Sequence, residues 1–193
     1  MAKYTKKEIL AELGGLLQEK PLDSITVTEL VERCGISRQA FYYHFSDLYG
    51  VVDYAILLMM DQVNQIAPTD WQKALYLTVA FLQDKRTVIL NAYHAYERSY
   101  VEHYMRQWAK PLVMPRVHKA AVRQQNVTRD QAEFVANLFT QALVSIMLSW
   151  VDRGMPNSVL DRLDDFCVLM DGCIDFIMDR LAQKNERTEE REK

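Results

Sequence analysis

The sequence predicts an all-α fold of about nine helices. Two observations support this prediction. The 193 residues include only 6 Gly and 5 Pro, which is few for the many turns of a sheet-rich fold. Helix-capping motifs also recur along the chain, and apolar residues follow each of them at helical spacing.

The first expected helix begins at a capping box formed by Thr5 and Glu8. It ends before Pro21, because the residue before a proline is disfavoured in the α conformation. Gly14 and Gly15 lie inside it, and each costs about 1 kcal/mol of helix stability relative to Ala. Close packing is the only role that the sequence offers for this pair.

The later helices are placed by the same signals, including a second capping box at Thr26 and Glu29. Helices are expected at 26–34, 37–45, 47–60, 70–92 (one or two), 95–125, 128–154 and 158–182, with interruptions at Pro111 and Pro115. The expected domains are a three-helix domain over 1–46, a larger helical domain over 47–183 and a polar, frayed tail over 184–193.

Composition excludes several classes of protein. With 23 Lys and Arg against 26 Asp and Glu, the net charge is −3, which excludes a globally basic nucleic-acid coat and a polybasic membrane anchor. Three cysteines imply no disulfide framework, which favours a reducing compartment. The chain shows no signal peptide and no uninterrupted apolar run of about 18 residues, so we expect a cytoplasmic protein.

The most informative segment is 26–45, where two short helices are joined by residues 34–37. Gly35 suits the left-handed conformation of a sharp turn, Ile36 can fill the crossing of the two helices, and Ser37 can cap the second one. This spacing is typical of a helix-turn-helix, whose second helix enters the major groove of DNA.

The second helix of this segment has two chemically distinct faces. Arg38 can form paired hydrogen bonds with guanine, and Gln39 can do so with adenine. Side chains that can bond phosphate or stack on bases follow at Tyr42, Tyr43 and His44. Phe41 and Phe45 share the opposite face, which is expected to point into the core.

The charge of this region limits its affinity for DNA. Residues 1–50 carry 6 basic and 7 acidic side chains, even with Lys3, Lys6 and Lys7 in the N-terminal arm. A DNA-binding segment is usually more basic. We therefore expect a local contact patch that depends on pairing two copies of the chain.

Residues 25–45 resemble the N-terminal signature of the TetR family of transcriptional regulators, and the nine-helix layout fits the family as well. The matching residues include Thr26, Val27, Gly35, Ser37, Tyr42, His44 and Phe45. The resemblance implies a repressor-like homodimer that binds a palindromic operator in double-stranded DNA and responds to an effector at its C-terminal domain. It also implies phosphate contacts by Thr26, Thr28, Ser37, Tyr42 and His44, and base contacts by Arg38, Gln39 and Tyr43.

The chain departs from the family pattern at several positions. Leu48 stands where a lysine usually touches phosphate, and Ala40 stands where a threonine usually touches DNA. Val31 and Cys34 replace alanines, which implies a slightly wider crossing of the two helices.

Three segments further resemble a subgroup of dihydroxyacetone kinase regulators. They are Lys-Pro-Leu-Asp-Ser-Ile-Thr-Val at 20–27, Phe-Tyr-Tyr-His-Phe-Ser-Asp-Leu-Tyr at 41–49 and Val-Ile-Leu-Asn-Ala-Tyr-His at 88–94. The subgroup implies that the effector is a protein co-regulator rather than a free metabolite.

The last two expected helices are the candidate dimer interface. Residues 134–151 are apolar nearly all round, which predicts burial on two sides. One polar row on this helix, formed by Asn137, Gln141, Ser145 and Ser149, either lines a pocket, lies at an interface or is a modestly solvated seam. The final helix carries an apolar stripe opposite many Asp residues, for which a solvated face is a better explanation than a metal site. In the resembled family, the last two helices of each subunit form a four-helix dimer interface.

Tyrosines recur at spacings of 3, 4 and 4 from Tyr93 to Tyr104, with Trp108 one turn further on. On one continuous helix they would share a face, either as core or as an effector pocket, since ligand sites are apolar with a few polar groups. The candidate pocket residues are Tyr93, Tyr96, Tyr100, His103 and Tyr104.

Catalytic motifs are absent from the sequence: we find no G-x-S-x-G, P-loop, G-x-G-x-x-G or H-E-x-x-H. No cofactor or metal is expected. The two hypotheses are a DNA-binding regulator and a helical protein-interaction module that has lost DNA binding. Leu48 and the acidic first segment favour the module, whereas the intact Ser37, Tyr42 and His44 favour the regulator more strongly.

Overall fold

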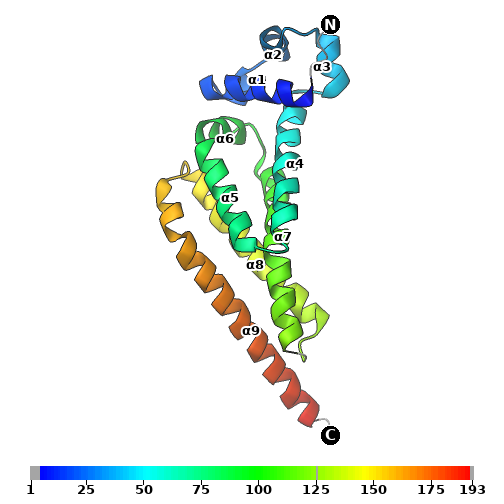
Figure 1. Cartoon of the computed structure of the whole chain (residues 1–193), viewed down its shortest axis with the longest axis vertical. Helices are drawn as coiled ribbons and strands as arrows, with labels where there is room; N and C mark the ends of the chain where they lie inside the picture. Colours follow the sequence, from blue (N-terminus) through cyan, green and yellow to red (C-terminus); the bar gives the residue numbers. More distant parts are fainter. Residues whose placement is uncertain (1–4, 125, 192–193) are drawn as a thin grey trace. The chain divides into compact units, whose positions relative to one another are not determined.

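The computed structural model describes residues 5–124 and 126–191, and within them it contains nine α-helices, two 3-10 turns and no strand (Figure 1). The all-α prediction is confirmed. The helices are α1 (Lys6–Glu19), α2 (Val27–Cys34), α3 (Arg38–His44), α4 (Leu48–Ile66), α5 (Trp71–Asp84), α6 (Arg86–Tyr93), α7 (Arg98–Arg123), α8 (Arg129–Asp152) and α9 (Leu163–Arg191). The 3-10 turns are η1 (Leu22–Ser24) and η2 (Asn157–Arg162).

The chain forms two compact units, and each is discontinuous in sequence. The first combines residues 1–61 with 82–101, and the second combines 62–81 with 102–193. The boundary at residue 46 follows the extent of the N-terminal motif and stays a prediction.

The first unit packs α1, α2, α3 and α6 around one apolar core. Ile9, Leu13, Leu30 and Phe41 are fully buried in it. The helix α6 returns from later in the chain to contact α1, where the side-chain amide of Asn91 donates to the Leu17 carbonyl at 2.9 Å.

Gly15 in α1 makes room for an arginine of α2. A Cβ at this position would lie 2.9 Å from Nη2 of Arg33, whereas one at Gly14 would meet nothing within 4 Å. The Arg33 guanidinium pairs with Glu12 at 3.2 Å and Glu19 at 2.8 Å. One glycine of the pair thus has a packing role.

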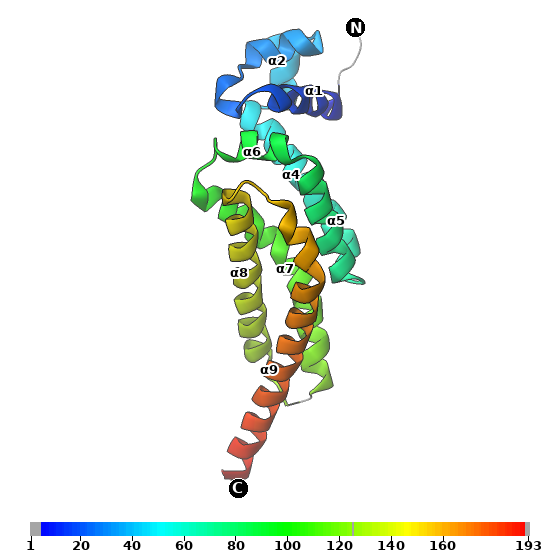
Figure 2. The ribbon, with the colours of Figure 1, turned by 90° about the vertical axis from the view of Figure 1, so that its left-hand side faces the viewer.

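The second unit is built on the long helices α7, α8 and α9. Trp108, Leu112, Trp150 and Ile174 are at most 2% exposed in its core. The helices α8 and α9 contact each other (Figure 2), and they run antiparallel, because Gln131 near the start of α8 bonds Asn185 near the end of α9.

Several aspartates of α9 form hydrogen bonds and ion pairs within the chain, which the side chains of a fully solvated face would not do. The guanidinium of Arg116 in α7 is 11% exposed and pairs with Asp171 and, at 2.8 Å, with Asp175. The Tyr76 hydroxyl donates to Asp164, and this hydrogen bond raises the pKa of Tyr76 to about 12. The expected solvated face is therefore in part a set of contacts within the chain.

Three local expectations differ from the structure. The chain breaks between α6 and α7, so the tyrosines do not share one helix. The helix α7 runs through Pro111 and Pro115, since burial of the neighbouring Leu112 and Val113 holds the segment in place. The helix α9 continues to Arg191, because its final residues are good helix formers without Gly or Pro.

The helix α8 is long and apolar enough to cross a membrane by length and composition alone. Half of its most apolar window is buried inside the unit, as in a core helix of a soluble protein.

Candidate DNA-binding surface

The turn between α2 and α3 has the geometry that its sequence predicts. Gly35 adopts a left-handed conformation with φ +67°, and the Ile36 amide donates to the Val31 carbonyl at 3.0 Å, which closes the end of α2. The Ser37 hydroxyl accepts from the Ala40 amide at 3.1 Å and caps α3. The expected turn and cap are both present.

The start of α2 is capped differently from a full capping box. The Thr26 hydroxyl accepts from the Glu29 amide at 3.2 Å, as predicted. The Glu29 carboxylate does not complete the box but pairs with Lys20 at 2.8 Å, which lowers the pKa of Glu29. The ammonium of Lys20, and not the backbone amide of Thr26, binds the Glu29 carboxylate, because a charged donor forms a stronger hydrogen bond than a backbone amide.

The helix α3 separates its two faces clearly. Phe41 is fully buried and Phe45 is 7% exposed, as predicted for the core face. On the other face Tyr42 is 56% and Tyr43 83% exposed, and Arg38 and Gln39 are exposed beside them. We call Arg38, Gln39, Tyr42 and Tyr43 the recognition surface.

Two residues of α2 and α3 are held together at the edge of this surface. The Arg38 guanidinium donates to the hydroxyl of Thr28, which is half-buried. This hydrogen bond links the first side chain of α3 to α2. His44 is half-buried, and its ring lies edge-on to Tyr43 at 5.0 Å between centroids.

Basic side chains near the surface have different roles. Arg33 is engaged by the two glutamates of α1 and is not directed at DNA. Leu48 is 8% exposed and packs in the core, so the position where the family usually carries a phosphate-binding lysine is part of the core in this chain. The ammonium of Lys6 lies 5.3 Å from the centre of the Phe45 ring, which brings one positive charge to the end of α3. Lys3 lies outside the described residues.

The candidate effector residues fall into both units. Tyr93, Tyr96 and Tyr100 belong to the first, and His103 and Tyr104 to the second. In the first unit Tyr96 stacks on Tyr100 at 5.1 Å, and the Tyr100 hydroxyl donates to Asp53 of α4 at 2.8 Å. Trp108 is core, because it is 2% exposed and its indole donates to Thr78.

Tyr49 of α4 joins this cluster, although the spacing of the later tyrosines did not predict it. Its ring lies edge-on to Tyr96 at 5.2 Å, and its hydroxyl donates to Asp23 in η1 at 3.2 Å. The tyrosine cluster, defined as Tyr49, Tyr96 and Tyr100, therefore touches the turn that leads into α2. Among the described residues, no group of three His, Cys, Asp or Glu is placed to hold a metal ion.

A small helical unit with a capped, exposed recognition helix, in a chain that also forms a larger helical unit, is typical of helix-turn-helix transcription regulators. Residues 9–53 match the family model of bacterial regulatory proteins of the tetR family, and residues 69–172 match that of the transcriptional regulator C-terminal region. The chain belongs to the TetR family of regulators, and it is accordingly not an enzyme.

A solved structure, the dihydroxyacetone kinase operon activator DhaS, shares the fold with a TM-score of 0.69 at 15% identity. The match covers 89% of this chain and 96% of that one. No curated protein sequence matches the chain.

Proposed function

We propose that the protein is a homodimeric, cytoplasmic regulator that binds a palindromic operator in double-stranded DNA through α3. The recognition surface supports this proposal most directly, because four side chains able to bond bases or phosphates are exposed together on a helix capped by Ser37. Thr26, Thr28, Ser37, Tyr42 and His44 are proposed phosphate contacts, and Arg38, Gln39 and Tyr43 are proposed base contacts.

Dimerisation is proposed through one face of α8 and α9. Phe134, Leu138 and Ile146 of α8 are 70%, 51% and 44% exposed on one stripe. Val168, Leu169 and Phe176 of α9 are 72%, 63% and 64% exposed. Contiguous apolar faces of this kind mark interfaces between proteins. The polar row Asn137, Gln141, Ser145 and Ser149 is exposed on the same side of α8 and becomes part of the interface.

Control by an effector, either a small molecule or a co-regulator protein, is proposed to reach the DNA-binding helices through the tyrosine cluster. Asp53 accepts from Tyr100 with one carboxylate oxygen, while the other is buried without a hydrogen-bond partner. An effector that donates a hydrogen bond there would satisfy a costly buried acceptor. Because Tyr49 bonds Asp23, such an effector would also act next to α2.

Repression follows most simply from a dimer that occupies an operator and excludes the polymerase. The test is binding to DNA that flanks the chain's own gene, measured over a salt series. We expect a specific complex whose log affinity falls steeply with log salt concentration, because phosphate contacts release counterions. If no complex forms even at low salt, the protein is instead an interaction module that has lost DNA binding.

The dimer itself is tested by sedimentation. We expect the wild-type chain to be dimeric at micromolar concentration and Leu169→Glu to be monomeric, since a carboxylate in the centre of an apolar interface is left without compensation. A wild-type monomer at that concentration would contradict the dimer.

A further inference from the structure

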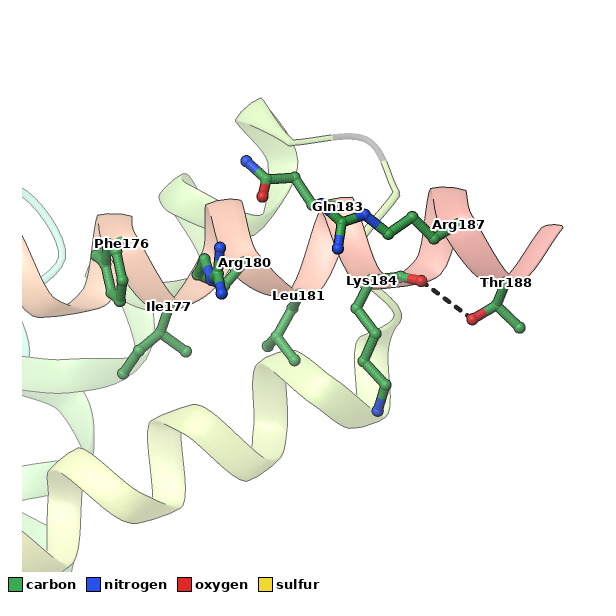
Figure 3. A pocket seen from close by; sticks show the side chains of 8 residues that line it. All are labelled: Phe176, Ile177, Arg180, Leu181, Gln183, Lys184, Arg187 and Thr188. Atoms are coloured by element: carbon green, nitrogen blue, oxygen red, sulfur yellow. Dashed lines mark hydrogen bonds between the residues drawn. The ribbon is translucent and has the colours of Figure 1, made fainter. Parts of the chain in front are cut away.

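The pocket on the C-terminal half of α9 belongs to the proposed dimer interface (Figure 3). Phe176, which lines this pocket, is 64% exposed and is part of the apolar stripe of α9. In the proposed dimer a second copy of the chain covers that stripe. We therefore assign no ligand to the pocket.

A different contact joins the two helices that are proposed to meet DNA. Nη2 of Arg38, the first residue of α3, donates to the hydroxyl oxygen of Thr28, the second residue of α2. Thr28 is half-buried, whereas Arg38 is exposed. Because threonine is branched at Cβ, its hydroxyl takes few orientations in a helix. The oxygen that Arg38 meets therefore has a restricted direction.

The charge of Arg38 is not neutralised by this contact, in contrast to the charge of Arg33. The guanidinium of Arg33 is paired with the carboxylates of Glu12 and Glu19. The partner of Arg38 is a neutral hydroxyl, and Arg38 forms no ion pair with any residue that the structure describes. Its guanidinium keeps its positive charge at the surface proposed to meet DNA.

The bond to Thr28 leaves Arg38 able to recognise a base. A guanidinium carries five N–H donors, with one two-donor edge formed by Nε and Nη2 and another formed by Nη1 and Nη2. Nη2 contributes a separate hydrogen to each edge, so the bond to Thr28 occupies one edge and leaves the other complete. The complete edge matches the O6 and N7 acceptors of guanine.

The Thr28 hydroxyl can donate a hydrogen bond while it accepts the one from Arg38. A hydroxyl has one hydrogen and two acceptor lone pairs, so both bonds can form at once. Within the described part of the chain, the hydroxyl hydrogen of Thr28 has no acceptor. A phosphate oxygen of DNA is an acceptor of the right kind.

We propose that Thr28 is a positioning residue for base recognition, which accepts from Arg38 and donates to a phosphate of the operator. The phosphate then determines where the Arg38 guanidinium lies along the base pairs, so that it contacts one base edge and not its neighbours. This inference rests on the proposed binding of DNA through α3. It gives Thr28 a role in selectivity, which a phosphate contact alone does not have.

The first experiment measures base preference with a library of DNA duplexes whose central segment is randomised. Wild-type protein and each variant select duplexes from this library, and the selected pools are sequenced. The base pair read by Arg38 is the one whose preference disappears in Arg38→Ala. We expect Thr28→Val to lower the preference at that same base pair about fivefold, as for one lost hydrogen bond. Thr28→Ser keeps the hydroxyl and should retain most of the preference.

Tyr42→Phe is the matched control, because it removes one hydroxyl that is proposed to contact phosphate and that forms no hydrogen bond with Arg38. It should weaken binding to all sequences alike and leave the base preferences unchanged. A uniform loss of affinity in Thr28→Val, like that in Tyr42→Phe, would show that Thr28 only touches phosphate and would overturn the proposal. Loss of the preference in Thr28→Ser as well as in Thr28→Val would also contradict it, since the hydroxyl would not be the cause.

The second experiment is a double-mutant cycle on the duplex that wild-type protein selects most strongly. The loss of affinity caused by Thr28→Val should be about fivefold smaller in an Arg38→Ala background than in the wild type, because the bond between the two side chains is already gone. Losses that simply add would refute the coupling and leave the proposed DNA binding intact. If wild-type protein selects no sequence at all, the proposed function fails, and the role of Thr28 fails with it.

Discussion

Gly14 and Gly15 allow a matched test of how α1 and α2 are joined. Both lie inside α1, where replacing Gly by Ala favours the helix by about 1 kcal/mol. At Gly14 the new methyl group meets nothing within 4 Å, so the full gain of about 1 kcal/mol should appear. For a chain of this length, that gain raises the melting temperature by about 2–4 °C.

At Gly15 the same substitution should gain less. The methyl carbon would lie 2.9 Å from Nη2 and 3.4 Å from Cζ of Arg33. Ordinary contact begins near 3.5 Å, so the guanidinium must move by roughly 0.6 Å or more. That shift lengthens its 2.8 Å contact with Glu19, a partly exposed ion pair, and so offsets part of the gain in helix propensity.

The assay is urea and thermal unfolding of four proteins: Gly14→Ala, Gly15→Ala, Arg33→Ala and the double variant of Gly15 and Arg33. Without the guanidinium, Gly15→Ala should recover the full gain of about 1 kcal/mol relative to Arg33→Ala alone. Equal stabilisation by Gly14→Ala and Gly15→Ala in the presence of Arg33 would refute the argument.

Four further predictions concern the first unit and the thiols. Arg38→Ala should weaken operator binding by about 1–3 kcal/mol and relax base selectivity in a gel shift; unchanged affinity and selectivity would remove Arg38 from the surface. Lys6→Gln should flatten the salt dependence of DNA binding by about 1.8 in slope for a dimer, and Lys73→Gln should not; equal slopes would show that Lys6 meets no phosphate. Phe41→Ala should cost about 3–5 kcal/mol of stability in denaturant, because its ring is fully buried. Burial raises the pKa of Cys34 and Cys167 to about 11, so at pH 8 neither thiol should label in native protein, and labelling at both would contradict their burial.

The sequence was most informative where local chemistry decides the structure. The capping box at Thr5 and the turn at Gly35 involve residues within three to five positions of one another, and both form as expected. Helical spacing also predicted which face of α3 is buried and which is exposed.

Long-range contacts decided the features that sequence could not predict. The break between α6 and α7 contains no Gly or Pro, and it is held by Tyr96, which stacks on Tyr100 and meets Tyr49 from another helix. The reason for Gly15 depends on Arg33, which lies in α2. The partner of Glu29 depends on Lys20 rather than on the capping pattern.

Because the first unit is discontinuous in sequence, its fold is complete only after residues 82–101 have been synthesised. Its core includes Ala92 of α6, and Asn91 holds α1 through the Leu17 carbonyl. During synthesis, the recognition helix emerges long before the segment 82–101 that completes its support. A nascent or truncated chain that stops at residue 61 would carry every proposed DNA contact and still lack part of its fold. Such an incomplete chain would present α3 without the contacts that α6 makes with the core of the first unit.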